Sequence, residues 1–267
     1  MTTLKIEDLI ELLSIAPQVG ATAKSLSDKK IKTLFLEGLT GSAAPVLFAT
    51  MAQKNLLPNA LFILNDEEEA GYFYHDLTQM LGNEQVLFFP SSYRRAIKYA
   101  QRDAANEILR TEVLSRCTMK DGRYLIVSYP EALAELVISR RQMDERTLSL
   151  EQGQDIDTSI IVTQLREFGF HEVDYVYEPG QFAVRGSILD VYSYSCEYPF
   201  RIDFFGDEID TIRTFDVETQ LSQAKRTEIE IVPELAHIES NKQCFLNFLS
   251  ESTPVSALYK GCLLYTI

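Results

Sequence analysis

Residues 199–216 read PFRIDFFGDEIDTIRTFD, and they contain two runs of β-type residues, at 200–205 and 208–215. Gly206-Asp207 separates the two runs. Glycine tolerates the positive φ that a tight hairpin turn requires, so a Gly-Asp pair between two such runs favours a hairpin. The stretch therefore predicts two antiparallel strands inside a β-rich module.

The residues before this hairpin extend the same module. A helical pattern near residues 158–168 leads into further β-type runs, which cover residues 174–177, 181–185 and 187–194. The module is also acidic, because residues 145–232 carry eighteen acidic and seven basic side chains, a net charge of -11 out of -14 for the whole chain. Composition and predicted structure change at the same place, so we expect an inserted, β-rich α+β domain at residues 145–232.

The first part of the chain alternates β-rich runs with helical patterns, which implies parallel strands joined by helical crossovers. We therefore expect an α/β domain at residues 1–144, with an open, mostly parallel sheet, flanking helices and a P-loop or RecA-like organisation. Residues 233–267, helical around 245–249, are expected to return to this domain and to be an incomplete part of it. The predicted strands are 32–37, 60–64, 85–89 and 124–128, and the predicted helices are 43–54, 66–81, 102–117 and one that begins at Pro130.

Composition excludes several classes of function. A net charge of -14 over 267 residues repels a phosphate backbone, so nucleic acid is not the favoured partner. The 4 cysteines and 3 histidines share no metal-ligand spacing and form no nucleophile motif, so we expect no metal, no cofactor and no catalytic residue. No apolar run approaches the ~20 residues that cross a bilayer, and the N-terminus is unlike a signal peptide. We expect a cytoplasmic protein with no membrane contact.

One loop has the position of a phosphate-binding loop but lacks its chemistry. Residues 38–45 read GLTGSAAP, between a predicted strand and a predicted helix. A working loop ends in Gly, then Lys for the β and γ phosphates, then Ser or Thr for Mg²⁺. We expect no nucleotide here, and a plain strand-to-helix turn is the simpler interpretation. The degenerate loop positions are Gly38, Gly41, Ser42, Ala43, Ala44 and Pro45.

Two charged stretches are open to a structural and a functional interpretation. Asp66-Glu67-Glu68-Glu69 resembles a Mg²⁺-positioning motif, but acidic residues in a first helical turn are favoured by the helix dipole alone. A basic stretch could bind DNA, with steep salt dependence, although interspersed acidic residues are typical of a solvated helix face. Its basic residues are Arg94, Arg95, Lys98, Arg102, Arg110, Arg116, Lys120 and Arg123.

Two segments resemble a module shared by bacterial transcription-repair coupling factor (Mfd) and the excision-repair subunit UvrB. The hairpin at 199–216 is similar to the conserved hairpin of that module. AVRGSILDVY at residues 183–192 is similar to the strand of that module in which Arg-Gly is followed by apolar residues and then by an acidic residue. The order of the parts matches as well, and the resemblance covers nearly the whole chain. It implies the split α/β domain with an inserted second domain.

The loop distinguishes the two branches of this resemblance. UvrB needs an intact nucleotide loop, whereas the N-terminal module of the coupling factor has lost it, as at residues 43–45 here. Only residues 91–101 are available where UvrB has its long DNA-gripping hairpin. The resemblance therefore implies the coupling-factor module, whose second domain binds UvrA at lesions that stall RNA polymerase. The alternative is a residual nucleotide-binding or ATPase domain of a UvrB-like repair protein.

The resemblance also implies partners and contact residues. The family's polymerase-binding domain and translocating ATPase motor lie outside these residues, so contacts with DNA and RNA polymerase are expected only through those domains. The resemblance also implies intramolecular contacts with the missing remainder of the family's chain, which would mask the UvrA-binding surface. Arg185 stands at the position of the family's partner-contacting Arg-Gly, with an internal salt bridge as the alternative. Leu189, expected on the same strand face, is a contact or a core residue. Arg166 and Arg201 are further candidates for UvrA contact.

Overall fold

The computed structural model of the chain describes residues 6–28, 30–93, 103–118, 123–235, 238, 242–251, 256–259 and 264–266. These residues divide into two compact units. The first unit comprises Met1–Ser92, Met119–Val137 and Gln243–Ile267. The second, here called the β-rich unit, comprises Tyr93–Thr118 and Ile138–Lys242.

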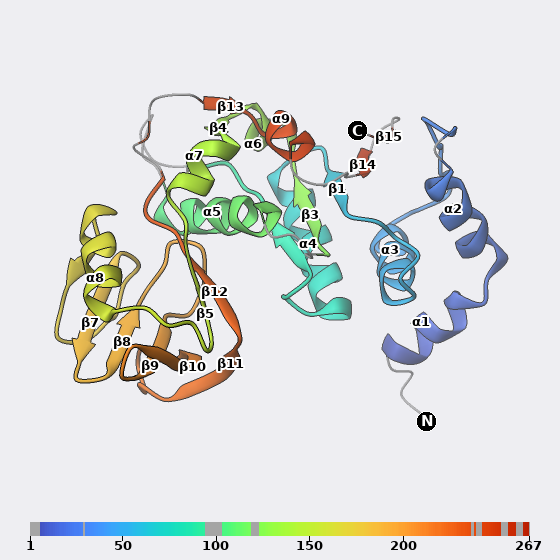
Figure 1. Cartoon of the computed structure of the whole chain (residues 1–267). Coiled ribbons are helices and arrows are strands. Elements are labelled where there is room, and N and C mark those ends of the chain that lie inside the picture. The colour runs from blue at the N-terminus through green and yellow to red at the C-terminus, as the bar shows by residue number, and fades with distance from the viewer. Residues whose placement is uncertain are drawn as a thin grey trace. The chain divides into compact units, whose positions relative to one another are not determined.

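Five strands form the sheet of the first unit, in the order β15-β14-β1-β3-β2 (Figure 1). β1 (Ala60–Ile63) pairs in parallel with β3 (Leu125–Ser128) on one side and with β14 (Ser256–Tyr259) on the other. β2 (Val86–Phe88) is parallel to β3, and β15 (Leu264–Thr266) is antiparallel to β14. The predicted α/β class with a mostly parallel sheet is confirmed.

Helices connect and flank these strands. α4 (Glu67–Leu81) follows β1, and Asp66 caps it by accepting a hydrogen bond of 2.9 Å from the Glu69 N–H. The acidic run at 66–69 therefore has the structural role of a helix start. Among the described residues, no helix is both long enough and apolar enough to cross a membrane. The other helices of this unit are α1 (Ile6–Ser14), α2 (Pro17–Ser27), α3 (Ala43–Gln53), α6 (Pro130–Ala134) and α9 (Phe245–Ser250).

The strand predicted at residues 32–37 is wrong. Residues 31–40 form neither helix nor strand, and the Phe35 side chain is 66% exposed. A strand needs a neighbour to pair its backbone N–H and C=O groups, and residues 32–37 pair with no described strand of the sheet. The apolar run at 32–37 therefore does not enter the sheet, and the loop at 38–45 does not follow a strand.

The β-rich unit is built on a six-stranded sheet in the order β11-β10-β9-β8-β7-β6. The predicted hairpin is confirmed, because β9 and β10 pair antiparallel across Gly206, whose φ is +66°. The run predicted as a strand at 174–177 is not one. The strands are β6 (His171–Glu172), β7 (Gln181–Arg185), β8 (Ile188–Val191), β9 (Phe200–Phe205), β10 (Glu208–Phe215) and β11 (Ser222–Arg226).

One face of this sheet forms the core of the unit. α8 (Thr158–Glu167) contributes Ile161 and Leu165, both fully buried, to a cluster with apolar residues of β7, β8, β9 and β10. β5 (Leu148–Glu151) and β12 (Glu228–Ile231) pair antiparallel and add further apolar side chains to the same cluster. The alternation of buried and more exposed residues along β9 follows the two-residue period of a strand with one buried face.

The boundaries of the two units differ from the predicted ones at 144 and 232. α5 (Ala104–Thr118) groups with the β-rich unit, although its helical pattern precedes residue 144. Arg140 of α7 (Arg140–Glu145) donates to the last carbonyls of α5, at 3.2 Å to Cys117 O and 2.8 Å to Thr118 O. Ser115 also donates to Glu230 of β12 at 2.6 Å. β4 (Leu136–Ile138) and β13 (Lys242–Cys244) form a separate two-stranded sheet.

Gly180 is a position where a side chain should not fit. Its φ is +85°, and a Cβ there would lie 2.6 Å from Tyr194 Oη. We expect Gly180→Ala to lower the free energy of unfolding by about 1–3 kcal/mol, since it combines a left-handed backbone with a clash. Gly153→Ala is the matched control, because its φ is +83° and nothing lies within 4 Å. Urea unfolding of both variants measures the difference, and equal losses would show that the Tyr194 contact is unimportant.

Candidate functional site

A tight hairpin presents the predicted contact residue Arg185. β7 ends at Arg185, Gly186 turns the chain with a φ of +63°, and β8 returns antiparallel from Ile188. Arg185 pairs with Ile188, while Leu189 pairs with Val184. The expectation that Arg185 and Leu189 share one strand face is therefore wrong, because the turn between them places them on neighbouring strands and on opposite faces of the sheet.

Leu189 lies in the core. Its side chain is 0% exposed and belongs to the buried cluster under the sheet, and Ile202 of β9 lies opposite it. Of the two interpretations that the sequence left open, the core residue is the one in the structure. Leu189 therefore supports the hairpin from below rather than offering a surface to a partner.

Arg185 is partly exposed on the other face of the sheet. Its Nη2 donates to Asp190 Oδ2, and 34% of its side chain is accessible. The guanidinium carbon also lies 5.0 Å from the centre of the Tyr175 ring, which is itself 52% exposed. A guanidinium above an aromatic face gains a cation–π attraction. The internal salt bridge is therefore present, and the side chain still reaches solvent.

Arg201 is more deeply held than Arg185. Its Nε and Nη2 donate to the two carboxylate oxygens of Asp190 at 2.7 and 2.9 Å, and its Nη1 donates to Gln220 O at 3.1 Å. The hydrogen bond with Asp190 raises the pKa of the Arg201 guanidinium. Arg201 also lies over the Phe215 ring at 4.3 Å from its centre. All three of its nitrogens are therefore engaged within the unit.

Arg166, the remaining candidate, is far more exposed. It lies near the end of α8 and forms an ion pair with Glu172 of β6 at 2.6 Å. Both side chains are about half exposed, and surface pairs of this kind contribute little to stability. The side chain is therefore accessible to a partner.

Sequence reasoning missed two residues beside Arg185. Asp190, whose side chain is 1% exposed, joins Arg185 and Arg201, and Tyr175 flanks Arg185. An aspartate among the apolar residues of a predicted strand was the available signal for Asp190, because a carboxylate that such a strand buries is almost always paired. Tyr175 gave no such signal, since its approach to Arg185 depends on the loop between β6 and β7.

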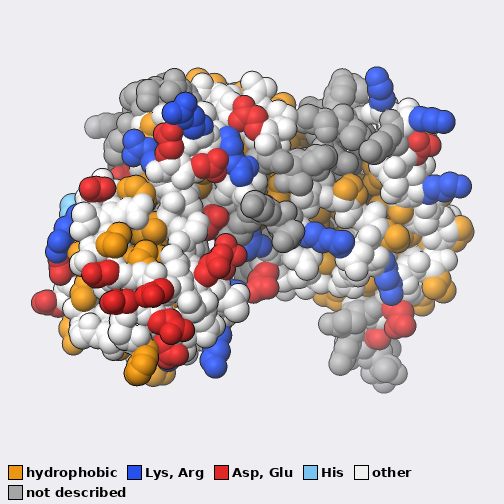
Figure 2. All heavy atoms as spheres, in the orientation of Figure 1, with side chains coloured by type: hydrophobic (Ala, Val, Ile, Leu, Met, Phe, Trp, Pro, Cys, Tyr) orange, Lys and Arg blue, Asp and Glu red, His pale blue; other side chains and the backbone are white. Residues whose placement is uncertain are grey.

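Exposed aromatic and apolar side chains accompany Arg185 in the same unit. Tyr175, Tyr177 and Val184 are 52%, 57% and 38% exposed. The visible face of the β-rich unit carries many acidic side chains with apolar ones among them (Figure 2). Aromatic residues and arginine are the types enriched where protein interfaces bind most strongly. Arg185 and the adjacent Tyr175 ring are together called the Arg185 surface below.

The loop at 38–45 lies before α3. Ser42 is the N-cap residue, but its side chain accepts no capping hydrogen bond, and Ala43 begins the helix. Gly38 and Gly41 both have positive φ, at +84° and +55°. Pro45 is buried in the first turn of the helix and has no N–H to offer an anion.

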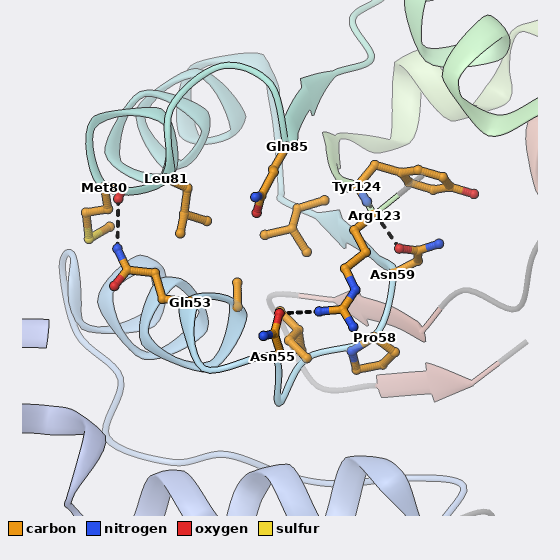
Figure 3. Close-up of a pocket in the computed structure, with 12 residues that line it drawn as sticks. Gln53, Asn55, Pro58, Asn59, Met80, Leu81, Gln85, Arg123 and Tyr124 are labelled. Atoms are coloured by element: carbon orange, nitrogen blue, oxygen red, sulfur yellow. Dashed lines mark hydrogen bonds between the residues drawn. The ribbon is translucent and has the colours of Figure 1, made fainter. Parts of the chain in front are cut away.

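A pocket of about 410 Å³ lies elsewhere in the first unit (Figure 3). Its lining comes from the ends of α3 and α4 and from residues just before β1, β2 and β3, so it lies at the amino ends of the parallel strands. Ligands of open α/β sheets bind at the carboxyl ends instead. Arg123 reaches into the pocket and donates to Asn55 Oδ1. The loop residues at 38–45 do not line this pocket.

The basic stretch is only partly described. Arg94, Arg95, Lys98, Arg102 and Lys120 lie outside the described residues. Arg110 and Arg116 lie on α5, where Arg110 is 5% exposed, and Arg123 belongs to the first unit. The described members therefore do not share one solvated helix face.

Comparison with known proteins points to the same unit. Residues 148–237 match the family described as UvrB interaction domain. The chain is 31% identical to the transcription-repair-coupling factor of Bacillus subtilis over 76% of its own length and 17% of that protein, and 29% identical to that of Escherichia coli over 73% and 17%. UvrABC system protein B of Clostridium botulinum is 26% identical over 84% of this chain and 35% of that protein. Residues 148–237 thus match the family described as UvrB interaction domain, within a chain that is similar over most of its length to bacterial transcription-repair-coupling factors.

Proposed function

We propose that this chain is a protein-interaction module of transcription-coupled nucleotide excision repair, which recruits UvrA to lesions that stall RNA polymerase. The UvrB interaction domain at residues 148–237 and the similarity to transcription-repair-coupling factors support the proposal. The chain spans 17% of the length of those coupling factors, so contacts with DNA and RNA polymerase are assigned to the remainder of such a protein. This role would place the chain in the cytoplasm.

The observation that carries the proposal is the partly exposed Arg185 beside the exposed Tyr175 ring. Arginine makes directional, bidentate contacts with carboxylates, and a neighbouring tyrosine supplies apolar area at low entropic cost. The Arg185 surface can therefore receive an acidic side chain of UvrA together with apolar contact around it. Arg166 would add a contact on α8. In a longer protein, contacts with other domains would cover this surface until it is needed.

Calorimetric titration of the 267-residue chain with purified UvrA tests the proposal. We expect saturable binding with a Kd in the micromolar range or tighter, which corresponds to a binding free energy of about -8 kcal/mol or a more negative value. If neither heat nor a complex on size-exclusion chromatography is detected, the proposed recruitment role is wrong.

We expect no binding of nucleotide at the loop before α3. Ala44 and Pro45 stand where a phosphate loop needs Lys and a hydroxyl, so neither a cation for the phosphates nor a Mg²⁺ ligand is supplied there. Fluorescence anisotropy of a labelled ATP analogue with Mg²⁺ should remain flat across the titration. Saturable binding that Ser42→Ala removes would favour the alternative, a residual nucleotide-binding domain.

A further inference from the structure

We propose that Asp190, together with Arg201 and Tyr175, positions the Arg185 guanidinium to receive a carboxylate of the partner. The inference rests on the proposed function, in which Arg185 contacts UvrA, and it adds Asp190 and Arg201, which act through Arg185 without touching the partner. Asp190 is central because one buried carboxylate receives both guanidinium groups.

Arg201 fixes the Asp190 carboxylate in place. β8 and β9 pair antiparallel, so Asp190 and Arg201 lie directly opposite each other. The guanidinium meets both carboxylate oxygens, at 2.7 Å and 2.9 Å, and only 14% of the Arg201 side chain is exposed. Such a two-point contact restricts both the position and the rotation of the carboxylate. The Arg201 side chain is therefore held by contacts within the domain, and its role is to orient Asp190.

Charge explains why Arg185 remains able to bind. Asp190 carries one negative charge and contacts two guanidinium groups, so the cluster of Asp190, Arg185 and Arg201 keeps a net positive charge. Arg201 already neutralises Asp190 through both oxygens. Arg185 contributes only Nη2 to the pair, and its Nε and Nη1 form no hydrogen bond with any other described residue. These two donors and the excess charge suit a second carboxylate.

The same contacts prepare the side chain for binding. A free arginine loses rotamer freedom when a partner immobilises it, and this loss weakens binding. Asp190 holds one end of the guanidinium, and the guanidinium carbon lies over the Tyr175 ring at 5.0 Å from its centre. Much of the rotamer entropy of the Arg185 side chain is thus already lost in the free domain, before the partner binds. The Asp190 carboxylate therefore raises the affinity for the partner only by holding Arg185, whereas the Tyr175 ring holds Arg185 and also offers contact area of its own.

A double-mutant cycle tests this coupling. The affinity for UvrA is measured by calorimetry for wild type, Asp190→Asn, Arg185→Gln and the double variant. We expect Asp190→Asn to weaken binding about tenfold in the wild-type background and less than about twofold in the Arg185→Gln background. Asp203→Asn is the matched control, because Asp203 pairs with Arg213 and Thr211 on the same sheet and not with Arg185.

Each outcome bears on one claim. If Asp190→Asn reduces the affinity for UvrA equally in both backgrounds, or in neither, the positioning role is wrong. The proposed function still stands in that case, provided that the wild type binds UvrA. Absence of binding by the wild type overturns both. If the melting curve shows that Asp190→Asn is unfolded, Tyr175→Leu replaces it in the cycle, since that side chain is 52% exposed. Coupling to Arg185 supports the inference in that case too, and additivity overturns it.

Discussion

Arg185→Glu is expected to weaken binding to UvrA by more than tenfold, which corresponds to more than about 1.4 kcal/mol. The change removes the donors for a partner carboxylate and places a like charge in front of it. It also brings a second carboxylate beside the buried Asp190, which now has only Arg201 as a counterion. Like charges in apposition at an interface reduce affinity strongly. Calorimetric titration with UvrA measures the change in Kd.

Lys225→Glu is the control for charge itself. Lys225 lies on the exposed strand β11 of the same sheet, and its replacement alters the net charge by the same amount. We expect its Kd to remain within about twofold of the wild-type value, because a distant surface charge mainly changes the rate of association. If both variants lose affinity equally, then the electrostatic field from the net charge of the domain governs binding, and the Arg185 surface does not.

Leu189→Ala is expected to lower the free energy of unfolding by about 2–5 kcal/mol. Leu189 is 0% exposed and lies opposite Ile202 in the main cluster of the β-rich unit, so truncation leaves a cavity that the strands cannot close. Chemical denaturation followed by circular dichroism measures the loss. Below the transition, the folded variant should bind UvrA as the wild type does, since the side chain has no exposed surface.

Val184→Ala is the matched control for this core substitution. Val184 lies directly opposite Leu189 on β7 but is 38% exposed, so we expect a loss below about 1 kcal/mol. If Leu189→Ala costs no more than Val184→Ala, then Leu189 is not part of the core. A large loss of UvrA affinity with little loss of stability would make Leu189 a contact residue.

Local sequence was sufficient where short-range chemistry decides the structure. The hairpin at 200–215 could be predicted because Gly206 permits the positive φ of the turn and both flanking runs are β-type. The start of α4 could be predicted because Asp66 offers a capping carboxylate to the first N–H groups. Both features depend on neighbours within a few residues along the chain.

Long-range pairing could not be predicted in the same way. Residues 32–37 have the composition of a buried strand, yet they stay outside the sheet, whose described strands pair in the order β15-β14-β1-β3-β2. α5 precedes the predicted boundary at residue 144, but Arg140 and Glu230 attach it to the β-rich unit. Which partner a segment meets depends on the competing segments, and composition does not record that competition.

The sequence by itself determined the alternation of strands and helices and the acidic β-rich domain, because residue type and spacing suffice for these. The proposal that Arg185 contacts a partner came from the family resemblance. Only the tertiary structure decided the surroundings of Arg185. The turn at Gly186 sends Leu189 into the core, and pairing of β8 with β9 brings Arg201 to Asp190. A side chain's partners are set by strand register, since a shift of one residue exchanges the two faces of a strand.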